Sequence, residues 1–257
     1  MKKVSLFVRS LILFLVMALG AFFWCFVCML AAPFPYKIRY WVTSRWNVAV
    51  IATAKYVCGI EYEIRGEENQ PDRPIIVLSK HQSAWETIFY LMALRRPLVF
   101  VFKRELILVP FFGWGLGLLR MIPINRSKGA DAFKMVVEIG KERLNSGQWV
   151  IMFPEGTRIP VGKAGKYKTG GTRFAIENGV EVLPIAVNSG ECWPKNSFLK
   201  YPGKITVSIG KPIASQGKTA DQLMKEVEGW IEAEMRVISP HVYAHEKALS
   251  QNQARQA

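Results

Sequence analysis

The sequence predicts an α/β fold, a single layered domain with a mixed central sheet flanked by helices, preceded by an N-terminal membrane-embedded helical segment. Two observations predict it. After residue 58, short apolar runs alternate with longer amphipathic stretches, a pattern typical of one sheet covered by helices. Before that point, residues 10–32 carry no charged side chain. A helix of about 20 such residues matches the apolar core of a bilayer.

The N-terminal segment, residues 1–58, fits a retained anchor better than a cleaved signal peptide. Its apolar run exceeds the roughly 7 to 15 residues of a signal-peptide core, and Tyr36, Tyr40 and Trp41 follow as at a membrane interface. Basic residues flank the run on both sides. The sequence therefore leaves open a spanning helix and a hairpin within one leaflet. Gly20 could mark the bend of the hairpin and is equally at home in a straight membrane helix. Residues 40–57 are predicted to form a second, interfacial helix.

Residues 59–240 are predicted to form the layered domain, and residues 241–257 a mobile tail. Apolar runs bounded by turn residues predict strands at 60–64, 75–78, 97–102, 121–124, 149–153, 182–187 and 205–209. Apolar residues at helical spacing predict helices at 83–94, 130–144, 172–178 and 220–237. In residues 106–119, Pro110 and three glycines favour short helical pieces or loop.

Charge and cysteine usage limit the classes of partner and the cellular compartment that the sequence suits. The net charge is +14, and residues 101–173 hold 13 Lys or Arg against 5 Asp or Glu. This surplus suits anionic lipid head groups or phosphorylated substrates. We expect no nucleic-acid partner, because no zinc-finger spacing or aromatic RNA-binding signature occurs. Cys25 and Cys28 lie in the apolar segment without a second ligand pair, which favours helix packing over metal, and Cys58 and Cys192 suit a reduced, cytoplasmic domain.

Residues 79–86, S-K-H-Q-S-A-W-E, place a histidine five residues ahead of a carboxylate. His81 is the only histidine among the first 240 residues, which makes it the candidate general base. It follows a predicted strand, and α/β sheets bind ligands at the carboxyl ends of strands. Glu86 can accept from one imidazole nitrogen and leave the other as the base. Residues 83–86 also match a capping box, in which Glu86 only satisfies an amide at the helix start.

Three further blocks carry candidate binding residues. Residues 153–158, F-P-E-G-T-R, follow a strand, and Arg158 can grip a phosphate there, although an ordinary surface turn is the alternative. Lys103 and Arg126 supply cations at strand ends, where a single cation is more often merely solvated. Residues 183–187, L-P-I-A-V, would alone be a core strand with Pro184 near its start.

In this order and spacing, the blocks resemble the four motifs of the glycerolipid acyltransferase family, most closely its bacterial 1-acyl-sn-glycerol-3-phosphate acyltransferases. The resemblance covers residues 75–187. It implies that His81 takes the proton from an acceptor hydroxyl as this attacks an acyl thioester, while Glu86 orients the imidazole. It implies that Pro184 belongs to the acyl or acceptor pocket. The residues that it implies for the acceptor phosphate and glycerol are Lys103, Arg126, Glu155, Gly156, Thr157 and Arg158.

The chain departs from the family pattern at three points. Glu86 stands where aspartate is usual, Asn125 replaces the more usual aspartate before Arg126, and residues 166–171, K-Y-K-T-G-G, replace a Lys-Lys-Gly. We expect the histidine and carboxylate to remain paired, because the helix can adjust to one extra methylene.

The expected function is acyl transfer from acyl-CoA or acyl carrier protein to the sn-2 hydroxyl of lysophosphatidic acid, giving phosphatidic acid. We expect it at the cytoplasmic face of a bacterial-type inner membrane. A thioester is already activated, so no metal or other cofactor is expected. Because no Ser or Cys stands in a G-x-S-x-G elbow, direct attack is favoured over an acyl-enzyme. The alternatives are another acceptor, such as a lysophospholipid or lyso-aminolipid, and a non-catalytic adaptor for anionic lipid, which leaves His81 and Glu86 unexplained.

Overall fold

A mixed sheet forms the centre of the domain. The structure is a computed structural model that describes residues 3–109, 111–125 and 129–244. Within these ranges the sheet has seven strands in the order β1-β7-β6-β2-β5-β3-β4. They are β1 (Ile60–Arg65), β2 (Ile76–Ser79), β3 (Leu98–Lys103), β4 (Ile122–Ile124), β5 (Trp149–Met152), β6 (Val182–Val187) and β7 (Gly203–Ile209). Neighbouring strands are parallel except β6 and β7. The predicted mixed α/β sheet is therefore confirmed.

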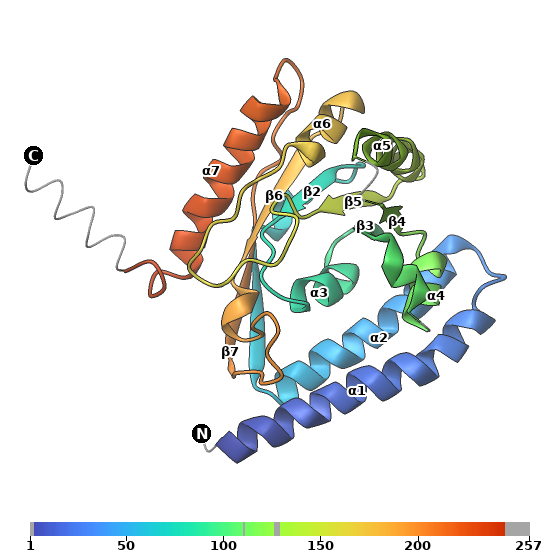
Figure 1. Cartoon of the computed structure of the whole chain (residues 1–257), viewed down its shortest axis with the longest axis vertical. Coiled ribbons are helices and arrows are strands. Elements are labelled where there is room, and N and C mark those ends of the chain that lie inside the picture. The colour runs from blue at the N-terminus through green and yellow to red at the C-terminus, as the bar shows by residue number, and fades with distance from the viewer. Residues whose placement is uncertain (1–2, 110, 126–128, 245–257) are drawn as a thin grey trace, which may run out of the picture.

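The central strands are almost entirely apolar because helices cover both of their faces. All residues of β2 and β6 are buried, as expected for parallel strands inside a layered domain. Figure 1 shows α7 (Ala220–Ile238) on one side of the sheet and α2 (Tyr36–Tyr56) and α3 (Trp85–Ala93) on the other. The remaining helices are α1 (Lys3–Leu30), α4 (Phe112–Leu118), α5 (Gly129–Asn145) and α6 (Gly170–Glu177), with short 3-10 turns η1 (Glu67–Asn69), η2 (Arg104–Leu108) and η4 (Ser189–Glu191).

Local sequence explains where helix α7 begins. Helix α7 starts with a capping box, in which Thr219 accepts from the Gln222 N–H and the Gln222 side chain accepts from the Thr219 N–H. The predicted short helical pieces in residues 106–119 are confirmed as η2 and α4. The predicted tail, residues 241–257, falls outside the described residues from 245 onward.

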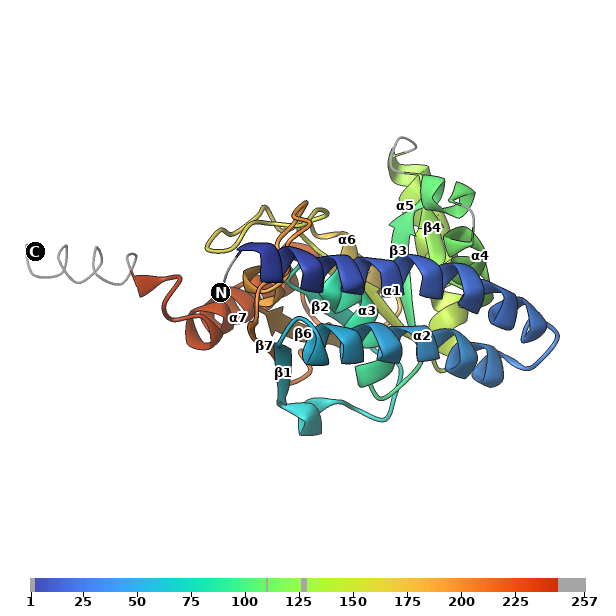
Figure 2. The same cartoon turned by 90° about the horizontal axis from the view of Figure 1, so that it is seen from below.

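Helices α1 and α2 form an antiparallel hairpin beneath the sheet (Figure 2). Of the two possibilities for Gly20, the straight helix is confirmed, since α1 continues through that residue and the chain reverses after α1 ends. A Cβ at Gly20 would lie 3.0 Å from the Trp46 indole nitrogen, so glycine here allows close helix packing instead. The Trp24 indole N–H also donates to the Val42 carbonyl at 2.9 Å. The second helix begins four residues before its predicted start because Pro35 precedes it as the N-cap.

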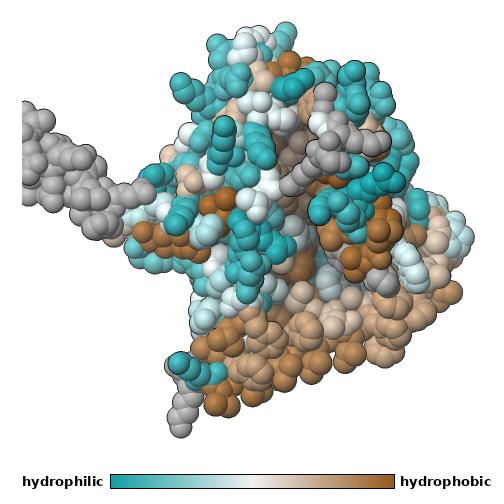
Figure 3. Space-filling view, in the orientation of Figure 1, coloured by the Kyte–Doolittle hydropathy of each residue, from teal (hydrophilic) through white to brown (hydrophobic). Residues whose placement is uncertain are grey.

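The hairpin contacts the domain along its whole length. Near the start of α1, the Ser10 hydroxyl accepts from the Lys200 N–H at 2.9 Å, and farther along it the Phe22 and Phe111 rings lie 5.0 Å apart. Helix α1 is long and apolar enough to cross a membrane. Its outward side forms a continuous hydrophobic band (Figure 3). The exposed large apolar residues of the hairpin include Val4, Phe7, Phe14, Leu19, Phe23, Leu30, Phe34 and Trp41.

Candidate active site

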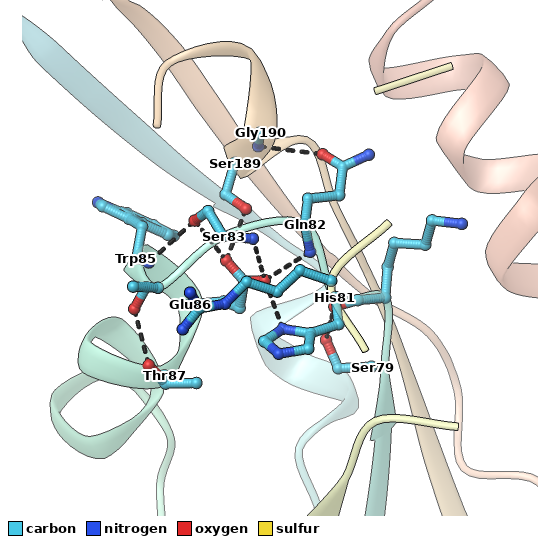
Figure 4. Close-up of polar contacts among 12 residues, drawn as sticks. Ser79, His81, Gln82, Ser83, Trp85, Glu86, Thr87, Ser189 and Gly190 are labelled. Carbon is cyan, nitrogen blue, oxygen red and sulfur yellow. Dashed lines mark hydrogen bonds and ion pairs between the residues drawn. The ribbon is translucent and has the colours of Figure 1, made fainter. Parts of the chain in front are cut away.

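His81 lies immediately beyond β2, near the middle of the sheet. Its Nδ1 is 2.9 Å from Glu86 Oε1 (Figure 4). Its ring stacks on Phe153, which follows the neighbouring strand β5, with centroids 3.8 Å apart and planes inclined by 15°. No residue in the described part of the chain hydrogen-bonds to Nε2, and His81 lines a cavity. Nε2 is therefore the nitrogen that can take up a proton from a bound substrate.

Glu86 is fully buried and both of its oxygens accept hydrogen bonds. Oε1 faces His81 and also accepts from the Gln82 N–H at 2.7 Å and the Ser83 N–H at 2.8 Å. Oε2 accepts from the hydroxyls of Ser83 at 2.7 Å and Ser189 at 2.6 Å. Burial alone would raise the pKa of Glu86, but the hydrogen bonds from His81, Ser189 and Ser83 outweigh it and lower the pKa. The ionised carboxylate favours a proton on the imidazole nitrogen that it faces.

The two interpretations of Glu86 are compatible in this geometry. The bond from the Ser83 N–H satisfies a donor at the start of α3, as the capping-box pattern predicts. The Ser83 hydroxyl accepts in turn from the Trp85 N–H at 2.9 Å. The same carboxylate faces His81, so the turn that starts the helix also orients the imidazole.

Ser189, which was not among the predicted site residues, lies in η4 shortly after β6. Strands β2 and β6 are parallel neighbours, so the segments after them meet at one edge of the sheet. The Gly190 N–H donates to Gln82 Oε1 at 3.1 Å, which ties η4 to the loop that holds His81. The available signal was a polar Asn-Ser-Gly sequence after a predicted central strand.

A cavity of about 740 Å³ opens beside His81. Its wall is mostly apolar and combines the hairpin with the sheet and the helices over it. Cys25 and Cys28 contribute to this wall, in keeping with the expected packing role. Other apolar lining residues are Met17, Ala21, Trp24, Ile88, Leu91, Phe100, Phe102, Phe111, Leu116, Leu119, Met121, Phe133, Val136 and Met152. A cavity of this size and character suits a flexible hydrocarbon chain.

Cations line the same cavity. Lys103, the last residue of β3, is largely exposed, and its Nζ lies 3.5 Å from Glu105 Oε1. Arg158 and Lys168 also line the cavity, and Lys168 was not among the predicted site residues. Gly156 has a φ of 67°, and a Cβ there would lie 3.2 Å from Lys168 Nζ, so glycine permits the close approach. These groups can bind a phosphate beside the imidazole.

Other predicted binding residues lie elsewhere. Glu155 does not line the cavity: its buried carboxylate accepts from Lys80, the His81 N–H and the Gly165 N–H. Thr157 is exposed, with its hydroxyl 3.4 Å from Lys195 Nζ, and does not line the cavity.

Pro184 is buried within β6, and a Cβ at Gly210 would lie 2.8 Å from its Cγ and 2.7 Å from the Trp230 ring of α7. Pro184 thus packs under α7 and does not line the cavity beside His81. Arg126 lies outside the described residues.

Comparisons with known proteins agree with the four-motif resemblance. A family model named Acyltransferase matches residues 61–188. The 1-acyl-sn-glycerol-3-phosphate acyltransferase of Pseudomonas aeruginosa is 44% identical over 238 residues, covering 91% of this chain and 92% of the relative. The 1-acyl-sn-glycerol-3-phosphate acyltransferase alpha of Mus musculus is 30% identical over 173 residues, covering 66% of this chain and 61% of its own.

The crystal structure of the 1-acyl-sn-glycerophosphate (LPA) acyltransferase from Thermotoga maritima shares this fold. The TM-score is 0.80 at 23% identity, and the match covers 93% of this chain and 98% of that chain. The predicted family relationship is therefore confirmed by sequence, and the layered fold by structure. The chain belongs to the acyltransferase family.

Proposed function

We propose that the protein transfers an acyl chain from a thioester to the sn-2 hydroxyl of lysophosphatidic acid, giving phosphatidic acid. One observation carries the proposal: His81, paired with a buried carboxylate, lines an apolar cavity that also contains the cations Lys103, Arg158 and Lys168. A hydrocarbon chain, a reacting hydroxyl and a phosphate thus have complementary surroundings within one site. The names of the bacterial and mouse relatives support the same acceptor.

The proposed mechanism begins with proton transfer from the sn-2 hydroxyl to His81 Nε2. The hydroxyl oxygen attacks the thioester carbonyl, forms the new C–O bond, and the C–S bond breaks as the tetrahedral intermediate collapses. The imidazolium returns its proton to the departing thiolate. Glu86 stabilises the positive charge on His81 and fixes the ring through Nδ1. No cofactor takes part in these steps, since the thioester is already activated.

The donor is acyl-CoA or acyl carrier protein, both of which present the acyl group as a thioester. We propose that the acyl chain occupies the apolar cavity while the acceptor phosphate binds the cations. The hydrocarbon contributes to binding roughly in proportion to its buried length, about 0.8 kcal/mol per CH₂. Lys103 and Arg158 donate charge-assisted hydrogen bonds to the acceptor phosphate, which orients the glycerol attached to it.

We propose that the hairpin lies within one leaflet of a bacterial inner membrane, with the domain on the cytoplasmic side. Near the two ends of α1, Phe7 contacts Phe198 and Phe26 contacts Phe111, and this supports the arrangement because a perpendicular helix would carry one of these contacts across the bilayer. The exposed apolar side of the hairpin would face the acyl chains of the lipids. A single-chain acceptor could then reach His81 without leaving the membrane interface.

Thioester cleavage tests the proposal. Detergent-solubilised protein receives acyl-CoA, with and without lysophosphatidic acid, and the released thiol is measured for wild type and His81→Ala. His241→Ala is a matched control, because His241 is exposed and pairs with Glu191. We expect thiol release that requires the acceptor, with wild-type rates for His241→Ala. Loss of a general base typically costs about 100-fold or more, so activity above about a tenth in His81→Ala would contradict the mechanism.

A panel of lyso-lipids tests the acceptor separately. We expect lysophosphatidic acid to be preferred over lysophospholipids that carry a head group and over lyso-aminolipids. Activity confined to a head-grouped or amino acceptor would retain the acyl-transfer chemistry and reject this acceptor. Lipid binding without any thioester cleavage across donors and acceptors would instead favour the adaptor function.

A further inference from the structure

A buried ionic cluster lies next to His81, and its members do not line the cavity. Lys80 immediately precedes His81 and its side chain is fully buried. Its Nζ lies 2.7 Å from both Glu155 Oε1 and Glu232 Oε1, and it donates to the Lys163 carbonyl at 3.1 Å. One ammonium thus joins the loop after β2, the loop after β5 and helix α7.

The cluster reaches the His81 backbone through Glu155. Glu155 Oε2 accepts from the His81 N–H at 3.2 Å, while Oε1 accepts from Lys80 and from the Gly165 N–H at 3.0 Å. On the other side of the residue, the His81 carbonyl accepts from the Ile159 N–H at 2.8 Å. The backbone of His81 is therefore held by the segment that Glu155 organises.

Glu232 is the member of the cluster that comes from α7. Its Oε1 also accepts from the Tyr167 hydroxyl at 2.8 Å. Burial, followed by the charges of Glu155 and Glu232, raises the pKa of Tyr167, which keeps this hydroxyl protonated as a donor. Burial and the neighbouring Glu232 raise the pKa of Glu228, one turn earlier on α7. The cluster therefore combines a lysine, two carboxylates directly bound to it and a phenol.

Stability alone does not account for such a cluster. Buried ion pairs are often replaceable by well-packed apolar residues at no cost to stability, because desolvation offsets the attraction between the charges. Removal of one partner is costly, since it leaves an uncompensated charge. A network of fixed charges and directional bonds does, however, define the position of a loop more narrowly than apolar packing.

We propose that Glu232 is a positioning residue for His81: through Lys80 and Glu155 it fixes the His81 backbone and so places Nε2 at the cavity. The inference rests on the proposed role of His81 as the base. It assigns the C-terminal helix α7 a part in the reaction, although Glu232 does not line the cavity.

Steady-state kinetics provide the first test. Glu232→Gln removes one charge from the cluster while preserving side-chain size, and Glu226→Gln is the matched control on the same helix, where Glu226 pairs with Lys218. A displacement of about 1 Å at a reacting group can cost about 100-fold in rate. We expect kcat of Glu232→Gln to fall at least about 10-fold, with KM for both substrates within about two-fold of wild type. Glu226→Gln should retain wild-type values.

Histidine NMR provides the second test, without turnover. The chain has three histidines, so ring-labelled histidine gives few signals, and His81→Ala assigns the relevant one. We expect Glu232→Gln to shift the His81 ring signals and Glu226→Gln to leave them unchanged. This readout distinguishes failure of the positioning inference from failure of the proposed acyl transfer.

The outcomes separate positioning from simple structural support. A kcat loss that disappears after correction for the folded fraction would overturn the inference, as would unmoved His81 signals in Glu232→Gln. If Glu232→Gln does not fold, Tyr167→Phe removes a bond to Glu232 but retains every charge. Relative to wild type, Tyr167→Phe should shift the His81 signals and lower kcat. Signals and a kcat equal to those of wild type would overturn the inference. Glu232→Asp should recover part of the rate lost in Glu232→Gln.

Discussion

Ser189 Oγ donates to Glu86 Oε2 at 2.6 Å across a separation of 103 residues, so a loop after β6 helps to hold the carboxylate that faces His81. The bond is buried and forms because β6 and β2 are parallel neighbours. Neither serine nor glutamate lies in the cavity lining, yet both determine how the imidazole is presented to it.

Ser189→Ala should lower both stability and turnover. It removes one of the two hydroxyl groups that donate to the buried Glu86 Oε2. Such a loss typically lowers the free energy of unfolding by about 1–3 kcal/mol. We expect kcat to fall several-fold because Glu86 becomes less firmly fixed. Denaturant unfolding and steady-state kinetics check the two effects. Ser197→Ala, which removes a hydroxyl bond to the Leu199 carbonyl, is the control, and equal losses in both variants would contradict a special role for Ser189.

Glu86→Gln should reduce kcat more than Glu86→Asp. Gln removes the charge that stabilises the His81 imidazolium and places an amide donor among groups that already donate. Asp retains the charge and the acceptor oxygens at a shorter reach. Comparison of kcat for the two variants checks this order. If Gln were harmless, the function of Glu86 would be limited to satisfying donors at the start of α3.

The lowered pKa of Glu86 predicts an acid-dependent loss of stability. In the unfolded chain the carboxyl titrates near 4.5, whereas in the folded protein it stays ionised to lower pH. Its contribution to stability is therefore present above about pH 4.5 and is lost as pH falls through the folded-state pKa. Thermal unfolding of wild type and Glu86→Gln between pH 6 and pH 3 checks this. The gap in midpoint should narrow only in the acidic range; a constant gap would disagree.

Arg158→Ala should weaken acceptor binding selectively. The guanidinium lies in the cavity that contains His81, where it can form two hydrogen bonds with a phosphate. Charge-assisted bonds contribute about 1.5–3 kcal/mol, which corresponds to an increase in acceptor KM of about 10-fold or more. The donor KM should change less. Arg65→Ala, which removes an exposed partner of Glu63, should change neither KM; a larger effect on the donor KM would place Arg158 at the donor.

Gly115→Leu should shorten the preferred acyl chain. Gly115 lines the cavity and a Cβ there meets no atom within 4 Å, so the new side chain can occupy space without displacing the backbone. Gly117→Leu is a close control on the same helix, since Gly117 has equal room for a Cβ but does not line the cavity. Competition between donors of different chain length measures the effect. An identical shift in both variants would point to α4 itself rather than to the cavity volume.

Local patterns in the sequence predicted most strands and the pairing of His81 with Glu86. Both depend on short separations: alternating apolar runs define the strands, and five residues across a strand-to-helix turn bring an imidazole to a carboxylate. The boundaries differ by a few residues where caps decide, as at Pro35 before α2. The sequence could not decide between a bend and a straight helix at Gly20, because both place a glycine in the same apolar run.

The ionic cluster next to His81 could not be predicted from local patterns. A lysine beside a motif histidine is ordinarily a solvated cation. Lys80 is instead buried, and it donates to Glu155 and Glu232, which lie 75 and 152 residues away in the sequence. Glu155 was assigned to substrate because the family resemblance implies that residues 153–158 hold the glycerol phosphate. Glu155 and Arg158 differ in their surroundings: the Glu155 carboxylate is buried and bonded to Lys80, whereas Arg158 lines the cavity.

The two sides of the hairpin have different surroundings, one facing the cavity and the other facing outward. Residues such as Met17 and Trp24 close the cavity, while Phe14 and Phe23 present apolar surface outward. Leu13 and Val50 belong to the same hydrophobic core as the strands. Cutting the chain after residue 58 would therefore not release a water-soluble version of the enzyme. It would open the cavity along one wall into a trough and expose the underside of the sheet, leaving the acyl chain without an enclosed place to lie.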